Sequence, residues 1–294
     1  MIPDEILVEI AHAIGEKRGA IDQSAIAPVL GGSINRSYVV TTRSGARYFL
    51  KINESSAREM FAAESEGLAA LKAAEAVRVP VIVACGAAAG TAFLLMEFLD
   101  MGGRADAAGA RLGRLLARQH SKTADAFGWH RNNTIGSTPQ VNAWDEDWVR
   151  FFGEQRLGYQ LDLACKNYAG EIRDRGDALL EKLPHLFDGY CPEPSLLHGD
   201  LWGGNWGVTR GGEPVIFDPA VYYGDREADI AMTHLFGGFG TEFYAAYDAA
   251  WPLEAGFEIR RDLYNLYHIL NHLNLFGDSY LRQAGNLIDR LMVQ

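Results

Sequence analysis

The chain has 294 residues with a formal net charge of −11 and three widely spaced cysteines. That length is sufficient for a large buried core, and the excess of acidic side chains argues against nucleic acid or an anionic membrane as a partner. Met1–Ile10 places acids before its apolar residues, unlike a signal peptide. No apolar stretch reaches the roughly 20 residues of a membrane helix, so we expect a cytoplasmic protein with reduced thiols.

The first elements are an amphipathic helix to about Lys17 and a hairpin with strands at 37–42 and 47–53. Three small residues lie ahead of the hairpin, Gly31, Gly32 and Ser33. Backbone amides in such a loop can approach phosphate oxygens closely, and we assign the loop to nucleotide binding. A plain hairpin with a glycine-rich entrance explains the same residues, and the chain contains no Walker A motif.

Lys51 lies late in the second strand, and a helix follows from about Ala57 to Ala74. An ammonium group that points into a protein needs a carboxylate partner. Glu64 lies on the apolar face of that helix, four residues before Leu68. We therefore predict an ion pair between Lys51 and Glu64 that positions a nucleotide. Glu59 and Glu66 are competing partners, and a solvated glutamate is the alternative.

Two further buried strands are predicted at 79–86 and 91–99, after which the composition becomes helical. We place a lobe boundary after residue 100. In a kinase-like arrangement, the backbone of Glu97, Phe98 and Leu99 at the end of the second strand would meet the adenine edge of a nucleotide, with Met96 packed behind it. An ordinary core strand has the same pattern.

Beyond residue 100, periodic apolar positions predict helices near 105–121, 144–168, 171–183, 225–236, 241–251, 259–276 and 279–292. The segment from Thr123 to Ala143 has little periodicity and many polar and glycine residues. Loops of that length are often functional. Its position suggests a lid over a substrate site.

The most informative segment is His198–Asn205, His-Gly-Asp-Leu-Trp-Gly-Gly-Asn, followed by Asp218. An Asp, an Asn five positions later and a second Asp after a short hairpin have the spacing used for phosphoryl transfer from ATP in kinase-like folds. Asp200 is then the base that accepts a hydroxyl proton. Asn205 and Asp218 hold Mg²⁺ against the phosphates. A simple turn between two strands is the alternative, since Gly, Asn and Asp are ordinary turn residues.

Three neighbouring residues have supporting assignments. We assign His198 to bracing the catalytic loop, because a buried loop must satisfy its backbone polar groups. Asp229 resembles the residue that ties the following helix to that loop in kinase-like folds. Trp202 either offers its ring to a sugar or to an ammonium group, or is an indole of the core.

Several segments resemble the fructosamine kinase (ketosamine-3-kinase) family, over a match from about Asp4 to Leu291. The Trp after the catalytic Asp-Leu and the run Gly-Ser-Thr-Pro-Gln separate this family from aminoglycoside and choline kinases, which share the fold. The matching segments are Phe127–Gln140 with Asn142, Trp148–Phe152, Arg156–Gly158, Leu196–Asn205 and Gly224–Met232.

The resemblance implies an α+β, two-lobed protein-kinase-like fold. Residues 1–100 form an N-lobe with a small antiparallel sheet and one main helix, and residues 101–294 form a larger, mostly helical C-lobe. It also implies a kinase that uses ATP and Mg²⁺ to phosphorylate the 3-hydroxyl of a ketosamine. The substrate is a ribulosamine, erythrulosamine or fructosamine, as a small molecule or on a protein lysine, and the unstable product releases the amine, which amounts to deglycation.

Two other functions are compatible with the motifs. A kinase of another amine-bearing small molecule, such as an aminoglycoside or choline, shares every phosphate-handling residue. A nucleotide-binding pseudokinase that scaffolds a partner is more remote. Such proteins usually lack Lys51, Asp200 or Asp218, and all three are present.

Overall fold

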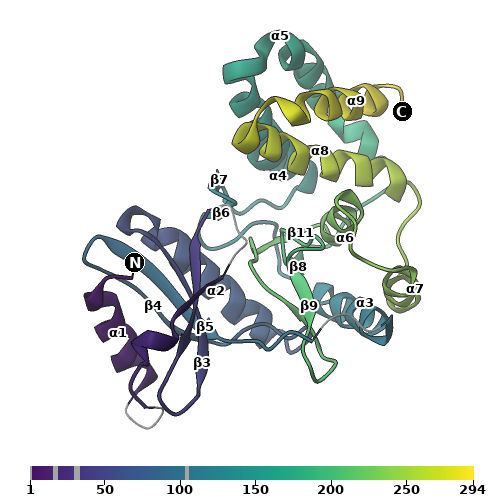
Figure 1. The fold of residues 1–294 in the computed structure, drawn as a ribbon. Helices are drawn as coiled ribbons and strands as arrows, with labels where there is room; N and C mark the ends of the chain where they lie inside the picture. The colour runs from purple at the N-terminus through teal and green to yellow at the C-terminus, as the bar shows by residue number, and fades with distance from the viewer. Residues whose placement is uncertain (1, 16–18, 30–33, 103–105) are drawn as a thin grey trace. The chain divides into compact units, whose positions relative to one another are not determined.

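The computed structural model describes residues 2–15, 19–29, 34–102 and 106–294, and the chain forms two compact units (Figure 1). The first unit contains Met1–Arg104 and Gly207–Phe217, and the second contains Ala105–Trp206 and Asp218–Gln294. The division near residue 104 lies close to the boundary predicted after residue 100. The return of residues 207–217 to the first unit is a feature that the prediction did not include.

A five-stranded antiparallel sheet in the order β1-β2-β3-β5-β4 forms the centre of the first unit. Helices α1 (Asp4–Ile14) and α2 (Arg58–Ala73) accompany it, with short 3₁₀ helices at Gln23–Ala25 and Ser55–Ala57. The strands are β1 (Ala27–Val29), β2 (Arg36–Thr41), β3 (Arg47–Glu54), β4 (Ile82–Ala88) and β5 (Thr91–Glu97).

The two helices of this unit pack against side chains on opposite faces of the sheet. Phe93 and Leu95 of β5 join Ile6 and Ile10 of α1 in one buried cluster. The alternate β5 residues, such as Leu94, join a second cluster with residues of α2. Successive side chains of a strand point to opposite faces of the sheet. Because β5 is apolar on both faces, it needs a helix on each side.

The hairpin of β9 (Trp206–Val208) and β10 (Pro214–Ile216) attaches to the first unit through backbone and side-chain bonds. The amide of Gly102 donates to the carbonyl of Val208 at 2.8 Å, and that of Ile216 donates to the carbonyl of Arg78 at 3.0 Å. The Arg78 guanidinium also pairs with Glu213 at 2.7 Å. These long-range contacts explain why a segment so late in the chain belongs to the first unit.

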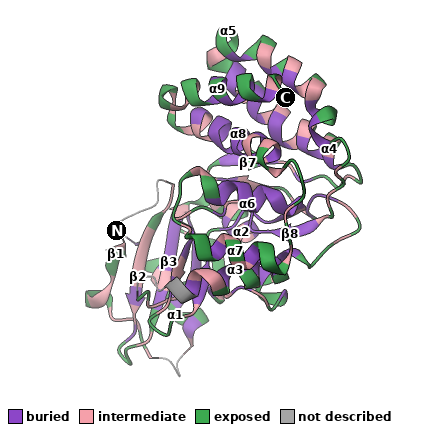
Figure 2. Ribbon diagram, turned by 90° about the vertical axis from the view of Figure 1, so that its right-hand side faces the viewer, coloured by how far each residue is buried: buried purple, intermediate pink, exposed green. Residues whose placement is uncertain are grey.

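The second unit is mostly helical. Helix α3 packs against α7 so closely that a Cβ atom on Gly113 would lie 2.3 Å from the carbonyl oxygen of Phe243, which is why glycine is needed there. Helices α6 and α8 are largely buried (Figure 2). The helices are α3 (Asp106–His120), α4 (Trp148–Phe152), a π-helix (Gly153–Gly158), α5 (Tyr159–Lys182), a 3₁₀ helix (Leu183–Phe187), α6 (Arg226–Leu235), α7 (Thr241–Ala250), α8 (Phe257–Phe276), a 3₁₀ helix (Asp278–Tyr280) and α9 (Leu281–Met292).

Two segments of the second unit differ from their prediction. The helices expected at 144–168 and 171–183 are one run from α4 to α5, in which Tyr168 has non-helical dihedral angles. The segment expected to be a lid contains a short hairpin, β6 (Asn133–Ile135) and β7 (Thr138–Gln140). Its residues Ile135 and Gln140 are buried, so this segment is a packed wall of the second unit and not an open loop.

No helix among the described residues is both long enough and apolar enough to cross a membrane.

His268 is a buried histidine on α8 whose protonation opposes folding. Its side chain is 4% exposed, and its Nδ1 atom has no hydrogen-bond partner among the described residues. Burial lowers the pKa of His268 to about 3, and the neighbouring His272 acts in the same direction. An unfolded histidine binds a proton below a pKa of about 6.5. The unfolded state therefore holds one more proton than the folded state between about pH 6.5 and pH 3.

We predict that His268 makes the protein sensitive to mild acid. Stability that is present above about pH 6.5 should be lost as the pH falls, by up to about 1.4 kcal/mol per pH unit from this one group. His268→Gln should therefore lose less stability than the wild type between about pH 7.5 and pH 5, measured as the free energy of unfolding in urea. His12→Gln, on the exposed side of α1, is the control. Equal pH slopes for wild type and His268→Gln would contradict the prediction.

Candidate active site

Lys51 is presented by β3 on the face of the sheet that α2 covers. Leu50 and Ile52 point into the cluster on the α1 side, so Lys51 between them points to the opposite face. There its Nζ atom donates to Oε1 of Glu64 at 2.7 Å, and the two side chains are only 6% and 11% exposed. The structure thus contains the predicted ion pair. Desolvation offsets much of the attraction in a buried pair, which favours a positioning role over one in stability.

The predicted base-binding segment lies at the end of β5. Met96 is buried in the cluster below α2, and the Glu97 carboxylate accepts a hydrogen bond from Arg78 at 2.6 Å. The guanidinium of Arg47 lies 4.3 Å from the centre of the Phe98 ring, and Leu99 is half-buried. These side chains are engaged within the first unit, so the backbone is the part best suited to meet a ligand. The glycine-rich loop, Gly31, Gly32 and Ser33, lies outside the described residues.

Strand pairing in the second unit places the catalytic loop beside the segment that follows Asp218. Strand β8 (Ser195–Leu197) pairs antiparallel with β11 (Tyr222–Gly224). Residues after β8 therefore lie next to residues before β11, and the Ala220 amide donates to the carbonyl of His198 at 2.8 Å. Gly199 has a φ of 81°, and a Cβ atom there would lie 2.1 Å from the carbonyl oxygen of Ala220. Only glycine fits this approach.

Asn205 joins the two predicted acidic residues. Its Nδ2 atom donates to Oδ2 of Asp200 at 3.0 Å and to the Asp200 carbonyl at 2.8 Å. The same atom lies 3.5 Å from the carbonyl oxygen of Asp218. Asp218 has a φ of 57°, a left-handed conformation that is uncommon outside glycine and often found at functional sites. The structure thus brings together Asp200, Asn205 and Asp218 in the second unit, although the β9–β10 hairpin separates Asn205 from Asp218 in sequence.

The Asp200 carboxylate lies in an enclosed setting, although the residue keeps some accessible surface. Burial raises its pKa to about 7, and the negative charge of Asp218 acts in the same direction. The hydrogen bond from Asn205 opposes the shift. A carboxyl group with this pKa can exchange a proton near neutral pH.

The Asp229 carboxylate binds the backbone at the start of the catalytic loop. Its two carboxylate oxygens accept hydrogen bonds from the amides of His198 at 2.7 Å and Gly199 at 2.8 Å. These bonds link α6 to the loop, which fits the tying role expected of Asp229. Burial acts to raise the pKa of Asp229, but the hydrogen bonds from His120 and the loop outweigh it and keep the pKa below the usual value. His198 is itself fully buried, and its Nδ1 atom accepts from the Asp200 amide at 3.3 Å, consistent with bracing.

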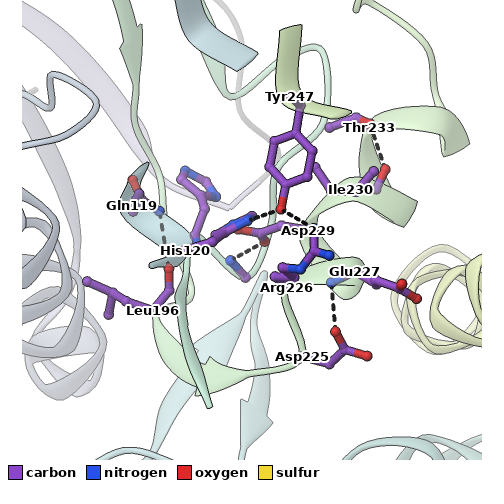
Figure 3. Close-up of polar contacts among 12 residues, drawn as sticks. Gln119, His120, Leu196, Asp225, Arg226, Glu227, Asp229, Ile230, Thr233 and Tyr247 are labelled. Carbon is purple, nitrogen blue, oxygen red and sulfur yellow. Dashed lines mark hydrogen bonds and ion pairs between the residues drawn. The ribbon is translucent and has the colours of Figure 1, made fainter. Parts of the chain in front are cut away.

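A hydrogen-bonded chain leads to Asp229 from His120 of α3, Tyr247 of α7 and Arg226, which lies on α6 with Asp229 itself (Figure 3). Burial lowers the pKa of His120, so its ring is neutral at pH 7. With Nε2 donating to Asp229 at 3.1 Å, its Nδ1 atom accepts from the hydroxyl of Tyr247 at 2.8 Å. Arg226 donates to that hydroxyl at 3.2 Å. The donor-only guanidinium at one end and the acceptor-only carboxylate at the other are both consistent with these bond directions.

Sequence reasoning missed His120, Tyr247 and Arg226. Each lies on a helix that was predicted, and His120 is the last residue of α3. A polar residue at a helix end is ordinarily exposed, so the sequence contains no sign that these three side chains meet.

Trp202 is 39% exposed, and its ring meets Phe236 edge-on at a centroid distance of 6.1 Å. The alternative that it is a core indole is therefore wrong. An exposed ring two residues after Asp200 is available to a ligand.

The donor set of Asn205 and Asp218 fits Mg²⁺. Because the nitrogen of the Asn205 amide is directed at Asp200, the amide oxygen is the atom left for a cation. An amide oxygen and a carboxylate are hard ligands, and Mg²⁺ is usually held by only one or two protein groups together with substrate phosphates.

Known proteins resemble this chain over nearly its whole length. The fructosamine kinase family model matches residues 6–294. A chloroplastic protein-ribulosamine 3-kinase of Arabidopsis thaliana is 46% identical over 268 residues, which cover 90% of this chain and 81% of the relative. A Synechocystis protein assigned as a ketoamine kinase is 45% identical over 265 residues, which cover 90% and 89% of the two chains.

A solved structure from Haemophilus somnus, assigned as a fructosamine-3-kinase, has a TM-score of 0.88 at 31% identity and covers 96% of both chains. An ADP-bound aminoglycoside phosphotransferase has a TM-score of 0.67 at 14% identity and covers 99% of both. At that identity the likeness shows the fold alone. The chain has the predicted α+β protein-kinase-like fold, and it belongs to the fructosamine kinase family.

Proposed function

We propose that this protein transfers the γ-phosphoryl group of ATP to the 3-hydroxyl of a ketosamine. The observation that carries the proposal is the single amide of Asn205, which links the Asp200 carboxylate to the backbone of Asp218. A base and a metal site held at one point are what phosphoryl transfer to an alcohol requires. Family membership supports the choice of acceptor.

Asp200 acts as the base in this proposal. A secondary alcohol is a poor nucleophile at neutral pH, so a carboxylate must accept its proton as the bond to phosphorus forms. The pKa of about 7 supports this role, because the carboxylate is then a stronger base than an ordinary Asp. Asn205 keeps the carboxylate oriented through its hydrogen bond.

Asn205 and Asp218 hold Mg²⁺ in this proposal, and the bound cation would neutralise charge on the phosphates during transfer. On the first unit, Lys51 meets the phosphates and Glu64 fixes the ammonium group, which the 2.7 Å bond between them supports. Gly31, Gly32 and Ser33 are assigned to the phosphates, and the backbone of Glu97–Leu99 to the adenine base.

Trp202 is assigned to the substrate. A ketosamine carries a cationic amine and a neutral polyol, and an exposed indole can bind a cation with about 0.5–2 kcal/mol. Phosphorylation at the 3-hydroxyl destabilises the adduct, so the amine is released. The activity proposed is therefore the first step of deglycation, on ribulosamine, erythrulosamine or fructosamine attached to a small amine or a protein lysine.

The acceptor is tested with purified protein, Mg-ATP and a panel of ribulosamines, erythrulosamines, fructosamines, aminoglycosides and choline. We expect phosphate at the 3-position of at least one ketosamine, located by ³¹P and ¹H NMR. Asp200→Asn should lower kcat by about 10²- to 10⁴-fold, while nucleotide still binds. Phosphorylation of only aminoglycosides or choline would reject the ketosamine acceptor, and full activity of Asp200→Asn would reject the base.

The metal assignment predicts a nucleotide affinity that depends on magnesium. Asp218→Ala should weaken ADP binding in the presence of Mg²⁺ and leave it unchanged when the metal is chelated, because only the cation is lost. Calorimetry with and without Mg²⁺ measures the difference. Asp174→Ala, at an exposed site on α5, is the control. An equal loss under both conditions would show that Asp218 does not act through the metal.

The nucleotide role of Lys51 can be separated from a role in stability. Lys51→Met leaves Glu64 buried without its cation and should cost about 3–5 kcal/mol of stability. The double variant Lys51→Met/Glu64→Leu should recover most of that stability but not the affinity for ATP. Thermal melts and the KM for ATP report the two effects. If the double variant regained normal ATP affinity, Lys51 would be structural only.

A further inference from the structure

Arg156 is a fully buried cation in the π-helix between α4 and α5. Its Nη1 atom donates to the backbone carbonyl of Val141 at 2.5 Å, and its Nη2 atom donates to Oδ1 of Asn142 at 2.6 Å. π-helical turns are rare and frequently occur at functional sites.

The groups around this guanidinium are neutral. Besides the two oxygens named, it donates to the carbonyl of Gln155 and lies 4.7 Å from the ring centre of Phe151 and 4.1 Å from that of Tyr222. Among the described residues, the contacts of Arg156 include no carboxylate. A guanidinium is charged in proteins, and burial of a charge without an opposite charge is costly. Neutral oxygens and two aromatic rings alone hold this charge, and its Nε atom has no hydrogen-bond partner among the described residues.

Arg156 is the donor at one end of a chain of three oriented side-chain amides, whose other contacts include backbone carbonyls. It has donors only, so the oxygen of Asn142 must face it. The nitrogen of Asn142 then donates to Oδ1 of Asn133 at 2.9 Å and to the carbonyl of Arg131 at 3.1 Å. Because that oxygen is an acceptor, the nitrogen of Asn133 is directed to the carbonyl of Val221, at 2.8 Å. Reversal of any one amide would set two acceptors or two donors against each other.

Gln140 forms a second branch of the same chain. Its Nε2 atom donates to Oδ1 of Asn133 at 2.8 Å and lies 3.3 Å from the carbonyl oxygen of Ala220. Its oxygen accepts from the hydroxyl of Tyr267 at 2.6 Å. Gln140 and Asn142 are 2% and 1% exposed, so water cannot readily replace these bonds.

Both branches end on the backbone that follows Asp218. The backbone carbonyls of Ala220 and Val221 are the acceptors for the side-chain amides of Gln140 and Asn133. The guanidinium of Arg156 stacks on the ring of Tyr222. The Ala220 amide in turn donates to the carbonyl of His198. One buried cation therefore acts on the segment that contains Asp218 and, through Ala220, on the loop that contains Asp200.

We infer that Arg156 is a positioning residue for phosphoryl transfer. Together with the backbone carbonyls of Arg131, Val221 and Ala220, it fixes the donor and acceptor directions of the amides of Asn142, Asn133 and Gln140. These amides hold the backbone after Asp218 in register with the catalytic loop. The catalytic consequence rests on the proposed function, whereas the effect on the backbone does not.

Asn142→Asp tests the direction of the chain. Aspartate would give Arg156 a carboxylate partner but could not donate to Asn133. If the cation only lacked a counter-ion, this variant would be more stable and fully active. We expect instead a fall in kcat on the order of ten- to a hundred-fold, a higher Mg²⁺ concentration for half-maximal activity, and faster hydrogen exchange of the amides in 218–223. Wild-type activity together with wild-type exchange would overturn the inference.

Arg156→Lys is the second variant. It keeps the charge but loses the planar fork and the stacking on Tyr222, so we expect the same loss of kcat and the same faster exchange, with a smaller change in melting temperature. Arg150→Lys is the matched control, since Arg150 lies on α4 with an exposed side chain paired to Asp145. An Arg156→Lys protein that behaves like this control would overturn the inference.

Hydrogen exchange separates this inference from the proposed function. If the wild type phosphorylated no ketosamine, the proposed acceptor would fail. The amides in 218–223 would still be expected to exchange faster in Asn142→Asp and in Arg156→Lys than in the wild type. Unchanged exchange in both variants would reject the positioning role, whatever the substrate.

Discussion

The carboxylate of Asp229 is the interaction on which the candidate site depends. It accepts both amides at the start of the catalytic loop, and without it two buried donors would lack partners, which costs about 1–3 kcal/mol each. In the same loop, Gly199 is left-handed and approaches Ala220 closely. The position of Asp200, one residue further, follows from this anchor.

Two chains of hydrogen bonds begin at buried arginines and end at the catalytic segments. Arg226 directs Tyr247 and His120 toward Asp229, and Arg156 directs Asn142 and its neighbours toward the backbone after Asp218. In both, a group that can only donate removes the freedom of amides, hydroxyls and imidazoles to reverse. Buried polar networks become rigid as their members are satisfied, and in the chain from Arg156 the Nε atom of the arginine itself is without a hydrogen-bond partner among the described residues. Such rigidity suits a reaction that depends on positioned charges.

The course of the chain also bears on the metal site. The chain leaves the second unit between Trp206 and Gly207 and returns between Phe217 and Asp218. The two candidate Mg²⁺ ligands, Asn205 and Asp218, therefore lie directly beside these crossing points. The intervening hairpin is attached to the first unit by Arg78, so the residues assigned to the metal are covalently tied to both units.

The sequence by itself determined the helices, the main strands, the pair of Lys51 and Glu64, and the grouping of Asp200, Asn205 and Asp218. Periodicity and short-range spacing are local properties, and the phosphoryl-transfer motif lies within one hairpin's length. The tertiary structure alone decided that Thr123–Ala143 is a packed wall, that residues 207–217 belong to the first unit, and that Arg156 and His120 support the site. Those outcomes depend on which buried donor meets which acceptor across distant segments, and a hydrogen-bond partner far along the chain leaves no periodic signal.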